Sequence, residues 1–418
     1  MPNDNQHALD TYRPDEFVVA LPYAPTIIDR AREFNLTCDP VDSPALGLTL
    51  LTPAWRDDSA AVLRAAVDER LTRADRDRVF SVLPPPRQGL RAPLEDLMFC
   101  LRYDFAADYG GWLPPMGKNR DVGVIGVPHV DGGALRDPEG AYRPAWADED
   151  KAGGAGVRVG ILDTGLYQHP DLAGGYLANR SDLVEPKDPY KHLAGHAAFV
   201  AGLVRRAAPR VELDVKQVLD NDRATGTVWD LARRMVEFRD SGVRILNLSL
   251  GCYTADGDPP FVLARAVRLL APDMVIVAAA GNHGDPRENA DRGLPAGSEQ
   301  RPFWPAAFED VLAVGALTGG DGAWREVEFS PHLPWVTMLA EGDGVVSTYL
   351  EGEVEIPTRG TEQFGGWARW AGTSFAAGVI SGELAALAEP GGSPLPAVRL
   401  LQERARRHPD GPVRLFEM

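Results

Sequence analysis

The chain of 418 residues is longer than an average domain, so we expect two or three domains or one large α/β enzyme with an appendage. Its 44% hydrophobic and 25% charged residues are typical of a soluble globular protein. Its formal net charge of −17 argues against a nucleic acid as the main partner, because phosphate groups would be repelled. No apolar run approaches the roughly 18 residues of a membrane helix, and residues 1–10 are too polar for a secretion signal. We therefore expect a cytoplasmic protein that binds neither nucleic acid nor membrane.

The cysteines indicate neither disulfide bonds nor a metal site. The chain has three, Cys38, Cys100 and Cys252, which are far apart and form no Cys-x-x-Cys pair. We interpret each as a small buried apolar residue. The sequence predicts no metal ligand set and no cofactor.

Residues 1–105 predict a small α+β domain. Short apolar runs indicate strands, and apolar residues at helical spacing indicate helices. The expected elements are a strand at 16–21, a helix at 25–34, a strand at 45–51, a helix at 59–71 and a strand at 97–103.

The rest of the chain divides into a connector and a larger domain. Residues 106–156 are rich in glycine and proline, which is typical of a connecting segment on a surface. In residues 157–418, nearly continuous apolar runs alternate with helical patterns. This alternation predicts an α/β fold, a doubly wound and mostly parallel sheet with helices on both faces. In such folds the functional residues usually lie at the carboxyl ends of strands.

Four residues with suitable chemistry lie at predicted element ends. Asp163 ends the run VRVGILD, His196 begins the helical segment HAAFVAG, Asn282 follows VIVAAAG, and Ser374 precedes a helix in GTSFAAG. A serine hydroxyl is a useful nucleophile only when an imidazole accepts its proton, and a carboxylate must orient that imidazole. An amide and a backbone N–H at a helix start can stabilise the oxyanion. The set predicts acyl transfer.

Many ordered motifs resemble those of the subtilisin-like serine peptidases, the subtilases. They include ILDTG with HPDL, HxxxVAG, LNLSLG, AAAGN, WPA with VLAVGA, and GTSFAAG, and they extend over about residues 157–387. The resemblance implies a serine endopeptidase that hydrolyses polypeptides through an acyl-enzyme. Asp163 would orient the imidazole, His196 would act as general base and then acid, Ser374 would be the nucleophile, and Asn282 would bind the oxyanion. The order Asp, His, Ser is that of subtilisin.

The resemblance also implies substrate-binding segments. Leu248, Ser249, Leu250 and Gly251 would pair with the substrate backbone as a strand, and Ala279, Ala280 and Gly281 would form one wall of the pocket for the side chain before the scissile bond. Phe303 would lie at the base of that pocket. A phenylalanine there would favour small residues, but two alternatives stay open: Phe303 can turn into the core, or Glu299 can select Lys or Arg.

Two departures from the family pattern are evident in the sequence. The usual His-Gly-Thr-His is His196-Ala197-Ala198-Phe199, and Gly378 stands where a proline is usual. Neither departure removes a group of the triad. The opposing hypothesis is a catalytically silent module of the same fold that captures a peptide.

The resemblance leaves two further expectations. Subtilases commonly carry an α+β propeptide, so the N-terminal domain would be either an intramolecular inhibitor or a recognition domain. Many also hold calcium between the helix of the catalytic histidine and the next strand. Here that connection, residues 203–209, is short and basic and contains no carboxylate, which predicts that this site is absent.

Overall fold

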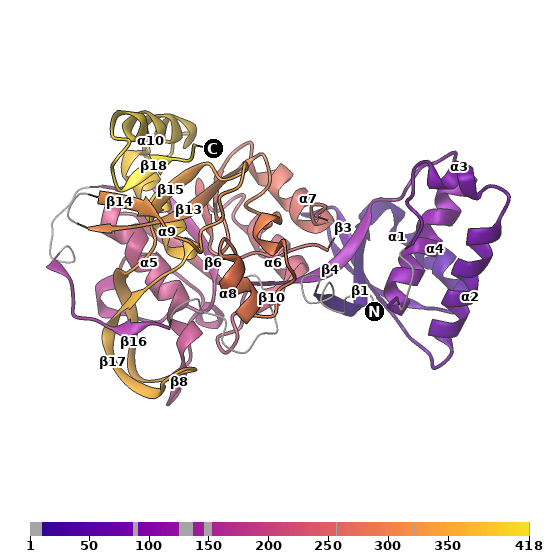
Figure 1. Ribbon diagram of the computed structural model, residues 1–418, viewed down its shortest axis with the longest axis horizontal. Coiled ribbons are helices and arrows are strands. Elements are labelled where there is room, and N and C mark those ends of the chain that lie inside the picture. Colours follow the sequence, from indigo (N-terminus) through magenta and orange to yellow (C-terminus); the bar gives the residue numbers. More distant parts are fainter. Residues whose placement is uncertain are drawn as a thin grey trace. The chain divides into compact units, whose positions relative to one another are not determined.

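A computed structural model describes residues 11–86, 91–124, 137–145, 153–255, 257–320 and 323–417 (Figure 1). Residues 1–10, on which the expectation about secretion depends, and much of the predicted connector lie outside these ranges. The chain divides into two compact units. The smaller unit comprises Tyr12–Arg120 with Pro260–Val262, and the larger unit holds Asp121–Pro259 and Leu263–Met418.

The smaller unit is an antiparallel sheet with helices packed on it. Strands pair in the order β4-β1-β3-β2, and α4 packs against β1, α1 and α2. A buried apolar cluster centred on residues such as Phe17, Leu63 and Leu97 fills the space between them. The elements are β1 (Tyr12–Ala20), α1 (Ala24–Ala31), β2 (Cys38–Ser43), β3 (Leu48–Pro53), α2 (Ser59–Thr72), α3 (Arg76–Phe80), α4 (Pro93–Asp108) and β4 (Met116–Gly123).

The predicted strand at 97–103 is wrong, because these residues belong to helix α4. A short apolar run does not distinguish a buried helix from a buried strand. Pro93 at the helix start, with Glu95 and Asp96 in the first turn, is the signal that favours a helix. Strand β2 was not predicted, since its sequence CDPVDS is polar and largely exposed at the edge of the sheet.

The predicted connector contains regular structure. Residues 106–108 end helix α4, and residues 116–123 form strand β4. Residues 116–120 of β4 pair with β1 in the smaller unit, whereas residues 121–123 belong to the larger unit and pair there with β10 (Thr225–Thr227).

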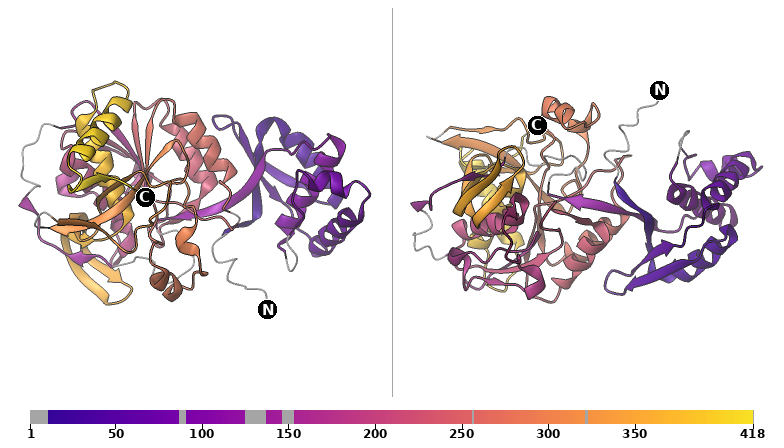
Figure 2. Two further views of the ribbon diagram at one scale, coloured as in Figure 1. Left: turned by 45° about the horizontal axis from the view of Figure 1, so that its top comes forward. Right: turned by 90° about the horizontal axis from the view of Figure 1, so that it is seen from below.

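The larger unit is built on a mostly parallel sheet (Figure 2). Its strands pair in the order β18-β15-β13-β12-β11-β6-β9-β7. Strands β18 and β14 are antiparallel to their neighbours β15 and β13, and the other pairs are parallel. The strands are β6 (Arg158–Asp163), β7 (Tyr176–Leu177), β9 (Glu212–Gln217), β11 (Ile245–Leu248), β12 (Val275–Ala279), β13 (Val311–Gly320), β14 (Ala323–Glu326), β15 (Met338–Glu341) and β18 (Val413–Leu415).

Helices cover both faces of this sheet. The connection from β6 to β9 contains α5, and the connection from β9 back across β6 to β11 contains α6. Right-handed crossovers that run in opposite directions place their helices on opposite faces. The predicted α/β fold class is confirmed. The helices are α5 (His196–Ala207), α6 (Val228–Glu237), α7 (Phe261–Leu270), α8 (Pro286–Asp291), α9 (Thr373–Leu387) and α10 (Leu395–Arg407).

A separate small sheet precedes α9. Its long hairpin of β16 (Val345–Ile356) and β17 (Gly360–Trp370) is flanked by β8 (Tyr190–Lys191) and β5 (Glu139–Gly140). The hairpin ends at Trp370, four residues before Ser374. Within the described ranges, no helix combines the length and apolar character needed to cross a membrane.

Candidate active site

Asp163 and His196 form a buried pair. Asp163 ends the central strand β6, and His196 is the first residue of α5. The Nδ1 atom of His196 lies 2.8 Å from Oδ1 and 2.9 Å from Oδ2 of Asp163, and the Thr164 N–H donates to the same carboxylate. A carboxylate at Nδ1 leaves the proton-accepting lone pair on Nε2. The arrangement suits a general base.

Ser374 lies in the first turn of α9, and it is tied to the strand that follows β11. Its hydroxyl donates to the carbonyl of Ser249 at 3.2 Å, and the Ser249 hydroxyl donates to the carbonyl of Ser374 at 2.8 Å. Asn247 continues this network, because its amide donates to Ser249 Oγ and its carbonyl accepts from Ser381. The expected substrate strand and the expected nucleophile therefore share one buried network.

The side chain of Asn282 is oriented by Thr373. Its Oδ1 atom accepts from the Thr373 N–H at 3.0 Å and lies 3.1 Å from the Thr373 hydroxyl. Because a backbone N–H must donate to an acceptor, it fixes the position of Oδ1 in the Asn282 amide, and Nδ2 is free of this hydrogen bond and can donate to another group. Nδ2 lies near Gly372, 3.7 Å from the place where a Cβ on that residue would stand. An amide donor thus lies beside the start of α9, next to Ser374.

Leu248–Gly251 runs beside a second extended segment of the larger unit. Gly123 and Gly251 exchange two backbone hydrogen bonds of 3.0 and 2.9 Å, and β10 pairs with residues 121–123 on the other side. The segment 121–124 is therefore the middle strand of three antiparallel segments. Gly251 is also one of the residues with which we expect a substrate peptide to pair. Sequence reasoning missed this segment because it lies in the predicted connector.

The loop before β10 depends on Asp220, which sequence reasoning also missed. Its carboxylate accepts from the backbone N–H groups of Asp222, Arg223 and Thr225 and from the Thr225 hydroxyl. The pKa of Asp220 lies below its ordinary value, because the effect of these hydrogen bonds, which lower the pKa, exceeds the opposing effect of burial. The Asp-Asn-Asp run that begins at Asp220 is the available signal, since such residues cap turns.

Phe303 lies between Gly251 of the predicted substrate strand and Gly281 of the predicted pocket wall. A Cβ added to Gly251 would lie 2.6 Å from Cζ of Phe303, and one added to Gly281 would lie 3.2 Å from its Cδ1. Phe303 is 1% exposed and packs with Tyr253 and Leu294. The ring therefore fills the slot between these glycines.

His283 closes the same region. A Cβ on Gly281 would meet its Nδ1 at 2.7 Å, and its ring packs edge-to-face on Tyr253 with centroids 5.0 Å apart. Its Nε2 donates to the carbonyl of Arg301 at 3.0 Å, which leaves Nδ1 without a proton. Burial lowers the pKa of His283 to about 4, so the ring is neutral at pH 7.

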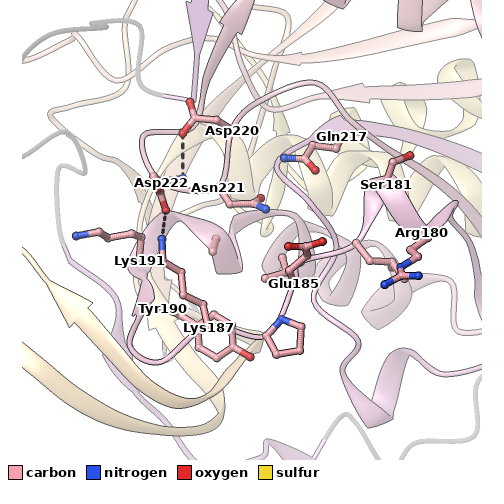
Figure 3. Close-up of a pocket in the computed structure, with 14 residues that line it drawn as sticks. Arg180, Ser181, Glu185, Lys187, Tyr190, Lys191, Gln217, Asp220, Asn221 and Asp222 are labelled. Atoms are coloured by element: carbon pink, nitrogen blue, oxygen red, sulfur yellow. Dashed lines mark hydrogen bonds and ion pairs between the residues drawn. The ribbon is translucent and has the colours of Figure 1, made fainter.

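A polar pocket of about 500 Å³ lies between the segment before α5 and the loop after β9 (Figure 3). Lys187 forms an ion pair of 2.8 Å with Asp222 at its wall. Asn221 also lines it and accepts from the Gly165 N–H, two residues beyond Asp163. Asn221 links the pocket to the segment after Asp163, and none of the four predicted catalytic residues lines the pocket.

Residues 203–207 of the predicted basic connection belong to helix α5, and Arg205 in its last turn binds two neighbouring segments. The guanidinium donates to the carbonyls of Asp171 and Pro209, each at 3.0 Å, while the Asp171 carboxylate binds Arg143 at 2.8 Å. Within the described ranges, no group of three or more His, Cys, Asp or Glu residues could hold a metal. The cation that binds the carbonyl oxygens of Asp171 and Pro209 is the guanidinium of Arg205.

We predict that removal of divalent metals leaves the melting temperature unchanged, whereas Arg205→Ala lowers it by several degrees. The substitution leaves two carbonyls without a charged donor, and each such hydrogen bond contributes about 1.5–3 kcal/mol. Exposed Arg399 on α10 provides the control Arg399→Ala. Thermal unfolding with and without a chelator measures both effects. A drop of many degrees with the chelator would contradict the prediction.

The comparisons with a family model and with known proteins point to one family. Residues 154–409 match the Subtilase family. The chain is 30% identical over 268 residues to a thermophilic serine proteinase of Bacillus sp. (strain AK1), covering 61% of this chain and 57% of that protein. It is 27% identical to an intracellular serine protease of Paenibacillus polymyxa, over 56% of this chain and 66% of that protein. The match thus spans little more than half of the Bacillus proteinase.

One solved structure shares the fold over most of the chain. Fervidolysin of Fervidobacterium pennivorans, a keratinolytic enzyme related to subtilisin, aligns with a TM-score of 0.56 and 18% identity. The alignment covers 96% of this chain and 60% of fervidolysin. The match of residues 154–409 to the Subtilase family, over more than half of the chain, shows that the chain belongs to this family.

Proposed function

We propose that this protein is a serine endopeptidase that hydrolyses polypeptides through an acyl-enzyme on Ser374. The observation that carries the proposal is the buried Asp163–His196 pair of 2.8 Å, whose imidazole packs on Phe375, the residue after Ser374 at the start of α9. The amide of Asn282, fixed by Thr373, supports it further. The serine protease relatives are consistent with this reaction.

In the proposed reaction the Ser374 hydroxyl turns from the carbonyl of Ser249 toward Nε2 of His196. The imidazole accepts the hydroxyl proton as Oγ attacks the scissile carbonyl, and Asp163 stabilises the imidazolium. Asn282 Nδ2 and the Ser374 N–H donate to the oxyanion. His196 then gives the proton to the leaving amine, and a water molecule repeats the sequence to release the acid.

Covalent labelling separates this proposal from a catalytically silent module. A fluorophosphonate probe should label Ser374 in the full chain, because the probe requires an activated serine and mimics the attacked carbonyl. Peptide mapping identifies the labelled residue, and Ser374→Ala is the control. An unlabelled, folded protein would favour the silent module that binds a peptide strand.

We propose that the enzyme prefers Ala, Gly or Ser before the scissile bond. The ring of Phe303 between Gly251 and Gly281 supports this choice over an open apolar pocket, since a filled pocket rejects large side chains by about 1–3 kcal/mol. Glu299 lies in a short 3-10 turn and is half-buried, so selection of Lys or Arg by its carboxylate stays an alternative.

Phe303→Gly should shift cleavage toward large apolar residues by about tenfold or more, because it empties the slot. Profiling on a peptide library measures the preference before the cut. Phe308→Gly is the control, as Phe308 contacts Trp304 and is not part of the slot. Dominant cleavage after Phe, Leu or Arg by the unaltered protein would contradict the proposal.

We also propose that the N-terminal unit inhibits the active site in the same chain. The end of β4, residues 121–123 of the larger unit, pairs with Gly251, and this supports inhibition over recognition, because the chain that leaves the N-terminal unit would compete with a substrate strand for Gly251. A cytoplasmic location stays a prediction, which the similarity to the intracellular protease of Paenibacillus polymyxa supports.

A further inference from the structure

Two aromatic side chains contact the imidazole of His196, and a third packs on both of them. They are Phe199, which stands where the family usually has a second histidine, Trp370 at the end of β17, and Phe375, which follows Ser374. All three are buried. They come from three different elements and contact one another, so they form a single aromatic group.

The rings cover the imidazole from two directions. The centroid of Phe375 lies 5.4 Å from that of His196 with the planes tilted by 40°, and Trp370 stands edge-to-face at 5.7 Å. Asp163 holds the Nδ1 edge of the same ring. The imidazole is therefore fixed by a hydrogen bond at one edge and by apolar contacts over its surface.

The closest ring contact of the group joins the two helices that carry the base and the nucleophile. Phe199 is one helical turn after His196 on α5, and its centroid lies 4.4 Å from that of Phe375 on α9. Gly382 lets these helices approach, because a Cβ there would lie 2.6 Å from the carbonyl oxygen of Val204. The Phe199–Phe375 contact thus fixes the two helix starts relative to each other.

We propose that Phe199, Trp370 and Phe375 form an aromatic clamp of positioning residues, which holds the imidazole of His196 in reach of Ser374. The inference rests on the proposed peptidase function and assigns roles to side chains that touch no reacting atom. Proton transfer between serine and imidazole needs a near-attack geometry, and a displacement of about 1 Å costs on the order of 10²-fold in rate. Substrate pairing at Gly251 does not involve the clamp.

The test is a comparison of leucine substitutions in the full chain. Phe375→Leu and Phe199→Leu should each lower kcat about 10–100-fold, with KM within about twofold of the unaltered protein. The rate of fluorophosphonate labelling should fall in parallel. In the double variant the losses should not multiply, because both substitutions remove the same contact.

Phe238→Leu is the matched control. Phe238 is equally buried, but it packs beside Gly160 on β6, away from the clamp. It should lower the melting temperature by a similar amount and leave kcat unchanged. If Phe375→Leu does not fold, Phe199→Leu removes the same ring contact from the other helix and should still lower kcat.

The outcomes separate the clamp from the peptidase proposal. A folded Phe375 variant with the kcat and labelling rate of the unaltered protein overturns the clamp alone. A loss of kcat equal to that of Phe238→Leu also overturns it, because the effect would then be general destabilisation. An unaltered protein that neither labels nor hydrolyses peptides overturns the proposed function itself.

Discussion

Replacing Ser374 or His196 with alanine is expected to lower kcat by about 10⁶-fold, the loss known for the same groups in subtilisin. The two groups act as one unit, since neither an unactivated serine nor a base without a nucleophile forms the acyl-enzyme. The double variant should therefore be no worse than either single one. Hydrolysis of a chromogenic peptide with matched circular dichroism spectra tests the prediction.

Asn282→Ala provides the graded comparison for this experiment. It removes one oxyanion donor, whose loss costs about 10²–10³ in kcat in subtilisin, and leaves the Asp163–His196 pair intact. Arg292 donates to the backbone carbonyl of Asn282, which the substitution retains. Undiminished hydrolysis by Ser374→Ala would contradict the mechanism, and an unchanged kcat in Asn282→Ala would contradict only the role of the amide.

The larger unit was predictable because its strands are buried on both faces. Near-continuous apolar runs reveal such strands directly, and their carboxyl ends meet at one edge of a parallel sheet. Asp163 ends β6 and Asn282 follows β12, and both strands pair with β11. Their carboxyl ends lie at the edge of the sheet where the imidazole of His196 packs on the residue after Ser374. Helix α4 was mistaken for a strand because burial around nearly its whole circumference removes the 3.6-residue period.

The parts of the site that were missed depend on long-range pairing. Asp220 orders a loop through backbone N–H groups, and Thr373 orients Asn282 through its own N–H, so neither role appears as a pattern of side chains. The sequence of segment 121–124 carries no motif that distinguishes it from other strands. Its place beside the predicted substrate strand follows only from its backbone pairing with Gly251. The packing of Phe199 on Phe375 likewise joins residues that are far apart in the chain.

Val122→Asp is expected to raise peptidase activity of the full chain at least tenfold. Val122 is fully buried in the middle strand of the three antiparallel segments, and an unpaired carboxylate at that place carries a desolvation penalty of several kcal/mol. The strand would leave its position beside Gly251 and β10, because hydration of the new carboxylate favours the released state. A tenfold change in occupancy requires only about 1.4 kcal/mol.

Val41→Asp is the matched control, because Val41 is 48% exposed on β2 and an aspartate there remains in water. Initial rates of peptide hydrolysis and the rate of fluorophosphonate labelling, measured at equal protein concentration, compare the two variants with the unaltered chain. Intramolecular inhibition predicts that Val122→Asp alone is activated and that an added peptide with the sequence of residues 121–124 slows it. If Val122→Asp folds with an unchanged melting temperature for the larger unit and gains no activity, the segment does not block substrate, and the N-terminal unit would instead serve recognition.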